Sequence, residues 1–95
     1  MEKDSVLCFG DCAVDLITAI DQIPVKEGCA FSDHLEINIG GTVLNTAIAL
    51  KRLGVNPSLV SKVGNDLFGN MILDFFKAQG VTADHISVTS DYPTG

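Results

Sequence analysis

The sequence has few basic residues and no long apolar run. Its 95 residues include 6 Lys and Arg against 12 Asp and Glu, so the formal net charge is −6. A negative chain whose few cations are scattered repels phosphate backbones and anionic lipid, so we expect neither a nucleic-acid nor a membrane partner. With 46% hydrophobic and 19% charged residues, the composition is that of a globular domain rather than a disordered chain or a membrane span.

Cysteine is scarce, and its spacing matches no disulfide or metal pattern. Cys8, Cys12 and Cys29 are odd in number and form no C-x-x-C motif. Only His34 and His85 could join them as metal ligands, and neither stands at ligand spacing. We therefore expect reduced thiols packed as small hydrophobic groups, no metal site and a cytoplasmic protein.

One domain is the most that this length allows. A chain this short buries only about 60–65% of the surface that its unfolded form exposes, so alone it would be marginally stable. Residues 91–95 have turn composition directly after an expected strand. We therefore expect residues 1–95 to be a portion of one longer domain.

An alternation of strands and helices predicts an α/β fold. The apolar run at residues 6–9, ended by Gly10, is typical of a strand buried on both faces of a parallel sheet. Residues 58–63 and 86–88 are expected to form the second and third strands. Glycine at each joint and the order strand, helix, strand, helix, strand indicate right-handed crossovers, with helices on the faces of the sheet.

Two amphipathic segments are the predicted helices. The first opens at residues 40–41 and ends at Gly54, and the second is capped by Asn65 or Asp66 and ends at Gly80. The apolar face expected for the first helix comprises Val43, Leu44, Ala47, Ile48, Leu50 and Leu53. The stripe expected for the second comprises Leu67, Met71, Ile72, Phe75 and Phe76. We expect the aromatic rings of Phe68, Phe75 and Phe76 to belong to the core.

Residues 13–39 do not fit this alternation and are expected to form an antiparallel excursion. A strict apolar–polar alternation at residues 35–39 places three aliphatic side chains on one face of a strand and polar groups on the other. This pattern predicts a half-exposed strand with one face in water.

The first candidate site is the glycine pair that opens the first helix. In such sheets, ligands bind beyond the carboxyl ends of strands, where glycines allow close approach and helix N-termini present free N–H groups. Asn45 lies in the opening turn, where its amide could offer a donor and an acceptor to a ligand resting on Gly40 and Gly41. The alternative is a plain turn in which Asn45 caps its own helix, and the local pattern does not decide between the two.

A second glycine cluster, at residues 64–69, follows a strand at P-loop spacing. Asn70 and Met71 stand where Lys and Ser or Thr would have to reach phosphate and magnesium, so we expect a turn and an N-cap instead. No G-x-G-x-x-G motif follows the first strand, so dinucleotide binding has no support either.

Asp15 is the one carboxylate set in an apolar frame, residues 13–17. An unpaired charge there would be costly, so we expect Asp15 to have a partner. A carboxylate can accept two hydrogen bonds from neighbouring hydroxyls, which suits a sugar diol. The alternative is that Asp15 faces water or pairs with a lysine.

In combination, these motifs resemble the N-terminal signature of the ribokinase-like (PfkB) carbohydrate kinases. The matching residues are Gly10-Asp11, Asp15, Pro24, Gly28, the stretch 40–47, Leu53-Gly54, the stretch 63–69, Gly80-Val81 and Thr94-Gly95. The resemblance implies a ribokinase-like α/β fold, a parallel sheet with flanking helices (βαβαβ) plus an inserted antiparallel β lid. Residues 1–95 would be the N-terminal portion of one sugar-kinase domain, and about 13–39 would contribute strands to the lid.

The family also implies an activity, the transfer of a phosphoryl group from ATP, with Mg²⁺, to a hydroxyl of a sugar or nucleoside. By position, Asp15 and Asn45 would bind substrate hydroxyls, and Gly40 and Gly41 would let the backbone approach them. The catalytic aspartate and the ATP site of the family lie near its C-terminus, and nothing in residues 1–95 matches them. We therefore expect no catalytic residue, no bound ATP or Mg²⁺ and no turnover by this chain alone.

Two departures from the family pattern affect the substrate. Ribokinases usually have Asn and Lys where this chain has Ala13 and Thr42, and both changes remove sugar contacts. A fructose-like sugar, a sugar acid or a nucleoside is therefore as compatible as ribose. In many members of the family the lid also forms a dimer contact, which makes a homodimer through the lid an expectation here.

Two other classes of protein share parts of the pattern. One is a non-catalytic sugar-binding or dimerising module derived from such a kinase. The other is an acidic receiver of flavodoxin-like topology, which would need paired acids after the first strand, whereas only Asp11 follows Gly10. The long excursion before the first helix also disfavours the receiver.

Overall fold

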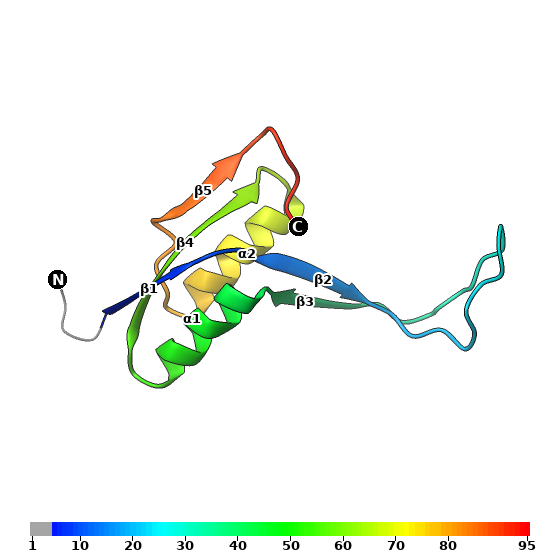
Figure 1. The fold of residues 1–95 in the computed structure, drawn as a ribbon, viewed down its shortest axis with the longest axis horizontal. Helices are drawn as coiled ribbons and strands as arrows, with labels where there is room; N and C mark the ends of the chain where they lie inside the picture. The colour runs from blue at the N-terminus through cyan, green and yellow to red at the C-terminus, as the bar shows by residue number, and fades with distance from the viewer. Residues whose placement is uncertain (1–4) are drawn as a thin grey trace.

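Three parallel strands form the main sheet. The computed structural model describes residues 5–95, in which β1 (Ser5–Phe9), β4 (Asn56–Gly64) and β5 (Ile86–Thr89) lie in the order β1-β4-β5 (Figure 1). Both neighbouring pairs are parallel. The three expected strands are therefore confirmed, although β4 begins two residues before the predicted start.

Two helices connect these strands and cover one face of the sheet. α1 (Thr42–Arg52) leads into β4, and α2 (Leu67–Ala78) leads toward β5. Side chains of both helices form one core cluster with those of the sheet. The cluster comprises Cys8, Cys12, Leu44, Ala47, Ile48, Leu59, Val63, Ile72, Phe76, Val81 and Ile86.

The opposite face of the sheet is open among the described residues. In β1 only Cys8 is buried, whereas Leu7 and Phe9 are 67% and 79% exposed. The prediction that residues 6–9 are buried on both faces is therefore wrong for this structure. The physical reason is that two successive crossovers of the same hand, taken in the same direction along the sheet, place both helices on one side.

The apolar faces of the helices are as predicted except at their ends and at Met71, which is half-buried outside the core cluster, whereas Leu73 packs against the core instead. Leu53 is the C-cap residue of α1 and is 79% exposed, and Leu67 is the first residue of α2 and is 71% exposed. Both lie beyond the part of the helix that the sheet covers. Of the three phenylalanines expected in the core, Phe76 is buried and Phe75 contacts it edge-on at a centroid distance of 6.1 Å. Phe68 is half-buried outside the core cluster, so its expected place in the core is wrong.

A two-stranded arm extends from this body. β2 (Ala13–Ile17) pairs antiparallel with β3 (Glu36–Gly40), and the connecting residues 18–35 contain no helix or strand (Figure 1). The arm gives the molecule extents of 56 × 31 × 20 Å and a radius of gyration of 16.4 Å, above the roughly 13 Å of a compact domain of this length. The expected antiparallel excursion is confirmed.

The two faces of this ladder differ in character. On one face, the cross-strand pairs are Val14 with Ile39 and Leu16 with Ile37. Val14 and Ile39 pack against the core, whereas Leu16 and Ile37, further along the arm, are 52% and 46% exposed. The polar face carries the pair formed by Asp15 and Asn38. The predicted alternation of faces is therefore present.

The three cysteines are free thiols in different surroundings. Cys8 and Cys12 are buried in the core, as expected. Cys29 is exposed in the arm, so the prediction that it packs as a small hydrophobic group is wrong. Within residues 5–95, no helix combines the length and apolar character needed to cross a membrane.

Candidate functional site

The base of the arm brings Asp15 against Gly40. Asp15 lies in the middle of β2, and Gly40 is the last residue of β3. A Cβ atom added to Gly40 would stand 2.8 Å from Asp15 Oδ2. The carboxylate therefore occupies the space that any larger residue at position 40 would fill, and the pairing of these two predicted site residues is observed.

Gly41 is required by the turn that joins β3 to α1. Its φ of 109° lies in a region that residues with a side chain rarely adopt, and an added Cβ would stand 2.7 Å from the backbone oxygen of Asp11. The Gly41 carbonyl also accepts the first backbone hydrogen bond of α1, from the Asn45 N–H at 2.9 Å. The plain-turn interpretation of this glycine is thus satisfied whether or not a ligand binds beside it.

Asn45 does not cap its own helix. The N-cap residue of α1 is Gly41, which has no side chain, and no side-chain hydrogen bond caps the helix. Asn45 lies in the first turn with its side chain exposed. The sequence left open that the Asn45 amide caps α1, and the structure does not show this role. The amide remains free to contact a ligand.

Asp15 has no protein partner in the described part of the chain. Its side chain is exposed, so water solvates the charge and the cost of an unpaired buried carboxylate does not arise. The expectation of a partner within the protein is therefore wrong. It rested on the apolar neighbours of Asp15, but Val14 and Leu16 point to the opposite face of the ladder.

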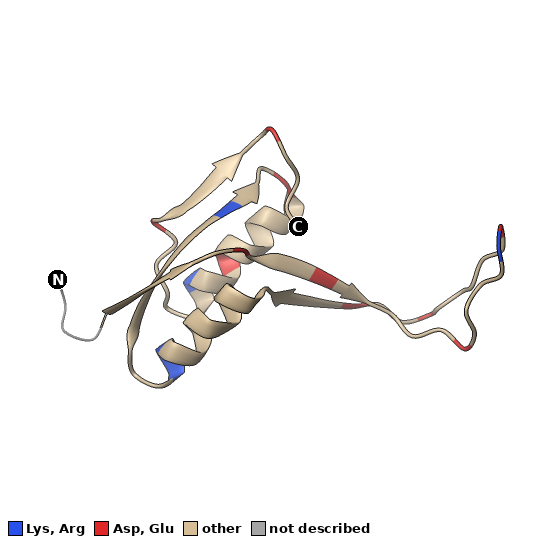
Figure 2. Cartoon of the chain, viewed as in Figure 1, with Lys and Arg blue, Asp and Glu red and all other residues tan. Residues whose placement is uncertain are grey.

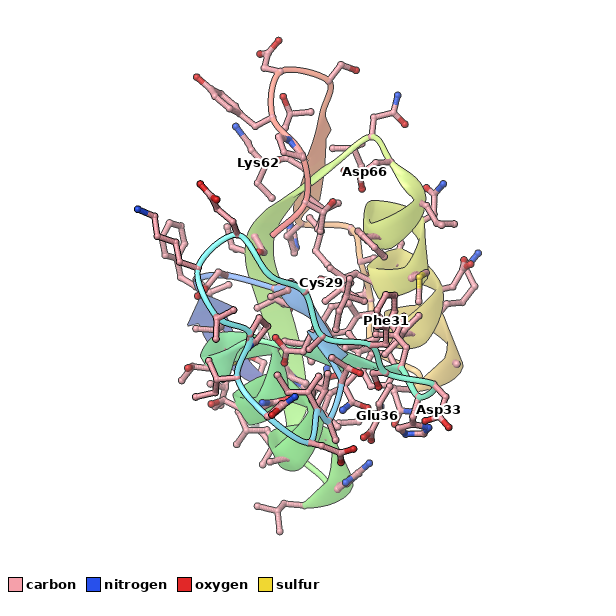
Figure 3. The ribbon with its side chains drawn as sticks, turned by 90° about the vertical axis from the view of Figure 1, so that its right-hand side faces the viewer. Cys29, Phe31, Asp33, Glu36, Lys62 and Asp66 are labelled. Atoms are coloured by element: carbon pink, nitrogen blue, oxygen red, sulfur yellow. The ribbon has the colours of Figure 1, made fainter. Side chains whose placement is uncertain are left out.

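The second glycine cluster forms a helix cap. Asp66 is the N-cap of α2 (Figure 3), and its Oδ1 accepts the Gly69 N–H at 2.8 Å. Gly64 at the end of β4 donates its N–H to Thr94 Oγ1 at 2.9 Å. The expected N-cap is therefore confirmed, and the Gly64 and Gly69 N–H groups are both used within the protein.

Asp66 also holds the segment that follows β5. The Thr94 hydroxyl donates to Asp66 Oδ1 at 2.7 Å, and the Thr94 N–H donates to Asp66 Oδ2 at 2.9 Å. These bonds, with that from Gly69, favour the charged carboxylate and lower the pKa of Asp66 below its usual range. We call this set of four bonds among Gly64, Asp66, Gly69 and Thr94 the Asp66 clamp.

The clamp is connected to the base of the arm. Gly95, next to Thr94, accepts the Val14 N–H on its backbone oxygen at 2.9 Å. Val14 precedes Asp15 in β2. The position of the Asp15 backbone is therefore fixed from two sides, by pairing with β3 and by the segment that Asp66 holds.

Sequence reasoning did not identify Asn38 as a neighbour of the site. Asn38 is the direct cross-strand partner of Asp15 and is exposed. The only signal in the sequence was its place on the polar face of an alternating strand. Its partner could not be predicted, because the register depends on how residues 18–35 close the loop.

The two strands of the arm base carry acidic side chains but no basic ones. Asp15 and Glu36 contribute carboxylates, and neither β2 nor β3 contains Lys or Arg (Figure 2). Within residues 5–95, no three His, Cys, Asp or Glu side chains come together as a metal site would require. The donor set of the described residues therefore does not fit a resident metal ion.

Comparisons with known proteins agree with this fold. The family model described as "pfkB family carbohydrate kinase" matches residues 3–95. A ribokinase of Bacillus subtilis is 31% identical over 96% of this chain, which corresponds to 31% of that protein. A fructokinase of Xylella fastidiosa, solved with bound ATP, has a TM-score of 0.79 and 31% identity, covering 98% of this chain and 28% of its own.

A third relative is a Methanocaldococcus jannaschii nucleoside kinase described as an archaeal member of the ribokinase family. It has a TM-score of 0.84 and 26% identity, covering 96% of this chain and 30% of its own. The predicted ribokinase-like fold is thereby confirmed. The chain spans about three tenths of the length of these relatives.

Proposed function

Because the chain belongs to the pfkB family of carbohydrate kinases, we propose that it is the sugar-binding and lid-forming part of an ATP-dependent sugar kinase. The observation that carries this proposal is the Asp15 carboxylate lying over Gly40 at the base of the arm, beside the start of α1. There a polyol can meet a charged acceptor and a backbone without a side chain. Residues 13–39, with the β2–β3 ladder, would form the lid over the bound sugar.

Each residue of the proposed site has a role that fits its chemistry. Asp15 accepts hydrogen bonds from two neighbouring hydroxyls of the substrate. Asn45 offers an amide donor and acceptor from the first turn of α1. Gly40 and Gly41 let the substrate come close to the backbone.

The phosphoryl donor is proposed to bind outside the described residues. ATP with Mg²⁺ supplies the γ-phosphoryl group when bound, but the Gly64 and Gly69 amides are occupied by the Asp66 clamp. The part of the chain described here therefore serves the acceptor side of the reaction and contributes no catalytic base. Dependence on ATP is consistent with a cytoplasmic location.

The relatives leave several acceptors open. They are named as ribokinase, fructokinase and nucleoside kinase. Ala13 and Thr42 stand at positions where ribokinases usually have sugar contacts, so we propose a sugar or nucleoside without assigning ribose. A non-catalytic sugar-binding module would use the same four residues and differ in lacking turnover.

The outer part of the lid also offers a surface for a second copy of the chain. Leu16 and Ile37 are cross-strand partners and both are about half exposed, in continuation of the buried pair Val14 and Ile39. We propose that this apolar face forms a homodimer contact. Replacing Leu16 by Asp should then shift the protein from dimer to monomer in analytical ultracentrifugation, and a monomeric parent would contradict the contact.

The decisive experiment measures sugar-dependent ADP formation by the complete gene product that contains residues 1–95. With ATP and Mg²⁺, the parent should phosphorylate at least one of D-fructose, D-ribose, D-gluconate and adenosine. Asp15→Ala should lower kcat/KM about 100-fold, as expected for two hydrogen bonds to a charged group. Asp74→Ala, which removes an exposed carboxylate of α2, is the matched control.

Two results would contradict the proposal. One is full activity of the Asp15→Ala protein with every substrate of the parent. The other is sustained ADP formation by residues 1–95 alone, because the acceptor side cannot transfer a phosphoryl group without the donor site.

A further inference from the structure

Asn38 is the residue closest in register to the proposed sugar-binding carboxylate. It pairs with Asp15 across the β2–β3 ladder, so both side chains project from the same face. Directly opposed Cβ atoms of an antiparallel pair lie about 4.5–5.5 Å apart. Gly40 is two residues further along β3 than Asn38 and therefore lies on the same face of the ladder. Asp15 Oδ2 lies close to the position that a Cβ atom of residue 40 would occupy. Asn38, Asp15 and Gly40 thus border the same space.

The Asn38 amide has unused hydrogen-bonding capacity. Its side chain is exposed, and its Nδ2 makes one long hydrogen bond, to Glu36 Oε1 at 3.4 Å. A primary amide has two N–H donors and a carbonyl acceptor. At least one donor and the oxygen therefore remain available beside Asp15.

The two side chains complement each other toward a hydroxyl group. The ionised Asp15 carboxylate can only accept hydrogen bonds, whereas a sugar hydroxyl both donates and accepts. A hydroxyl that donates to Asp15 still needs a donor for its own oxygen, and the Asn38 amide can supply one. Binding a hydroxyl between the two satisfies groups that neither residue satisfies alone.

The charge of this face favours a neutral ligand group. Glu36 and Asp15 both lie on it, and β2 and β3 contain no cation (Figure 2). A carboxylate or phosphate of a substrate would be repelled here by two negative charges. The chemistry of this face therefore favours an uncharged hydroxyl beside Asn38.

We propose that Asn38 binds substrate together with Asp15 and helps to determine which sugar is accepted, by recognising an uncharged diol. This inference rests on the proposed function. The competing explanation is that Asn38 only separates the carboxylates of Asp15 and Glu36 and serves the stability of the arm. The two explanations differ in whether the identity of the substrate changes the effect of a mutation.

The test compares Asn38→Ala with the parent in the complete gene product, with D-fructose, D-ribose, D-gluconate and adenosine as substrates. With the preferred substrate, KM should rise about five- to tenfold while kcat stays within about threefold, as expected for the loss of one hydrogen bond. Asn70→Ala, an exposed amide of α2, is the matched control and should match the parent.

Deoxy analogues of the preferred substrate separate binding from a structural role. The parent should disfavour the analogue that lacks the contacted hydroxyl, and Asn38→Ala should lose most of that discrimination for this one analogue. Asn38→Ser, which keeps a small donor and acceptor, should recover part of it. A structural role would instead affect all analogues equally.

Calorimetric titration with the same sugars keeps this inference separable from the proposed function. If the parent turns over a sugar and depends on Asp15, but Asn38→Ala binds and discriminates like the parent, only the role of Asn38 is overturned. If the parent forms no ADP with any substrate, the kinase proposal fails. An unchanged sugar affinity of Asn38→Ala in the calorimeter would then overturn the role of Asn38 as well.

Discussion

Positions 40 and 41 are adjacent, but they require glycine for different reasons. At Gly41 the backbone itself is the reason, because φ is 109° and the Asp11 carbonyl is close. Gly40 has no positive φ, and the only close neighbour of an added Cβ is the Asp15 carboxylate. Substitutions at the two positions should therefore separate folding from binding.

We expect Gly40→Ala to fold normally and to bind sugar poorly. The new methyl group would displace the Asp15 carboxylate, which should lower kcat/KM on the order of 10–100-fold. Gly41→Ala should instead destabilise the fold by about 1–3 kcal/mol because the backbone conformation is strained. Steady-state kinetics and thermal melting of the two variants check both effects. A Gly40→Ala protein with parental kinetics would show that the carboxylate is not held in a required position.

The exposed and the buried thiols should react at very different rates. Cys29 is exposed, whereas burial, with a smaller contribution from the charge of Asp11, raises the pKa of the Cys12 thiol. Its hydrogen bond to Ser61 Oγ, at 3.4 Å, opposes this only in part. Under native conditions at pH 8, an aromatic disulfide reagent should therefore modify Cys29 first, and Cys12 only after unfolding. The Cys29→Ser variant should lose the fast phase, and rapid labelling of Cys12 would contradict its burial.

The sequence suggested the residues of the proposed site one by one, but it did not predict their mutual contacts. Asp15, Gly40 and Asn45 were identified from local pattern and family resemblance. That Asp15 faces Gly40 and Asn38 depends on the register of β2 against β3, which is fixed by a long loop without repeating pattern. The wrong expectation of a partner for Asp15 arose because apolar sequence neighbours in a strand lie on the other face.

At the level of the elements, α2 and the segment after β5 are joined by one carboxylate. The N-cap role of Asp66 was predictable, since a cap is defined by residues within one turn. Its bonds to Thr94 were not, because the two residues are 28 positions apart in the sequence. The exposed ends of the helices, Leu53 and Leu67, were mispredicted for a similar reason, because periodicity does not tell how far the sheet extends.

We expect Thr94→Val to destabilise the protein by about 1–3 kcal/mol at pH 7. The variant keeps the shape of threonine but removes the hydroxyl that donates to Asp66 and accepts from Gly64. Urea unfolding measures the loss, and Thr89→Val, whose hydroxyl accepts only the exposed Asp91 N–H, is the control. Equal stability of Thr94→Val and the parent would mean that the Asp66 clamp contributes nothing to the fold.

The same bonds give a direction for the effect of pH. Because the folded protein lowers the pKa of Asp66, the clamp contributes its full stability above the ordinary value of about 3.9. That stability is lost as the pH falls from this value through the lower pKa of the folded state. Melting temperatures between pH 6 and pH 2 should therefore fall less steeply for Asp66→Asn than for the parent. A steeper fall of the melting temperature for Asp66→Asn than for the parent would contradict a lowered pKa of Asp66 in the folded protein.

For the whole molecule, the distinguishing feature is the arm. Residues 18–35 have no regular structure and expose large apolar side chains, among them Ile23 at 88% and Phe31 at 90%. Most exposed large apolar side chains of the described chain lie in the arm and on the uncovered sheet face with Leu7 and Phe9, and others, such as Leu53, Leu67 and Tyr92, lie elsewhere. Composition and periodicity predicted the excursion but could not predict how far it extends from the sheet.

Limited proteolysis should detect this arrangement. Lys26 is the one basic residue in residues 18–35, whereas Lys51, Arg52, Lys62 and Lys77 lie in helices or strands. Among the sites in residues 5–95, trypsin should therefore cut first after Lys26, and Lys26→Gln should remove this early cut. Mass spectrometry of the first fragments identifies the site. Initial cleavage at Lys51 or Arg52 would show that α1 opens more readily than the arm.

The hydrogen bond from Val14 to Gly95 has a consequence for how the chain matures on the ribosome. The Gly95 carbonyl that receives the Val14 amide proton is synthesised about 80 residues after Val14. Until then the base of the arm is held by the β2–β3 pairing alone, while the parallel strands β1 and β4 are already able to assemble. The base of the arm would thus complete its hydrogen bonds only after Gly95 has been synthesised, so a translational pause before this residue would leave the strand that carries Asp15 held from one side only.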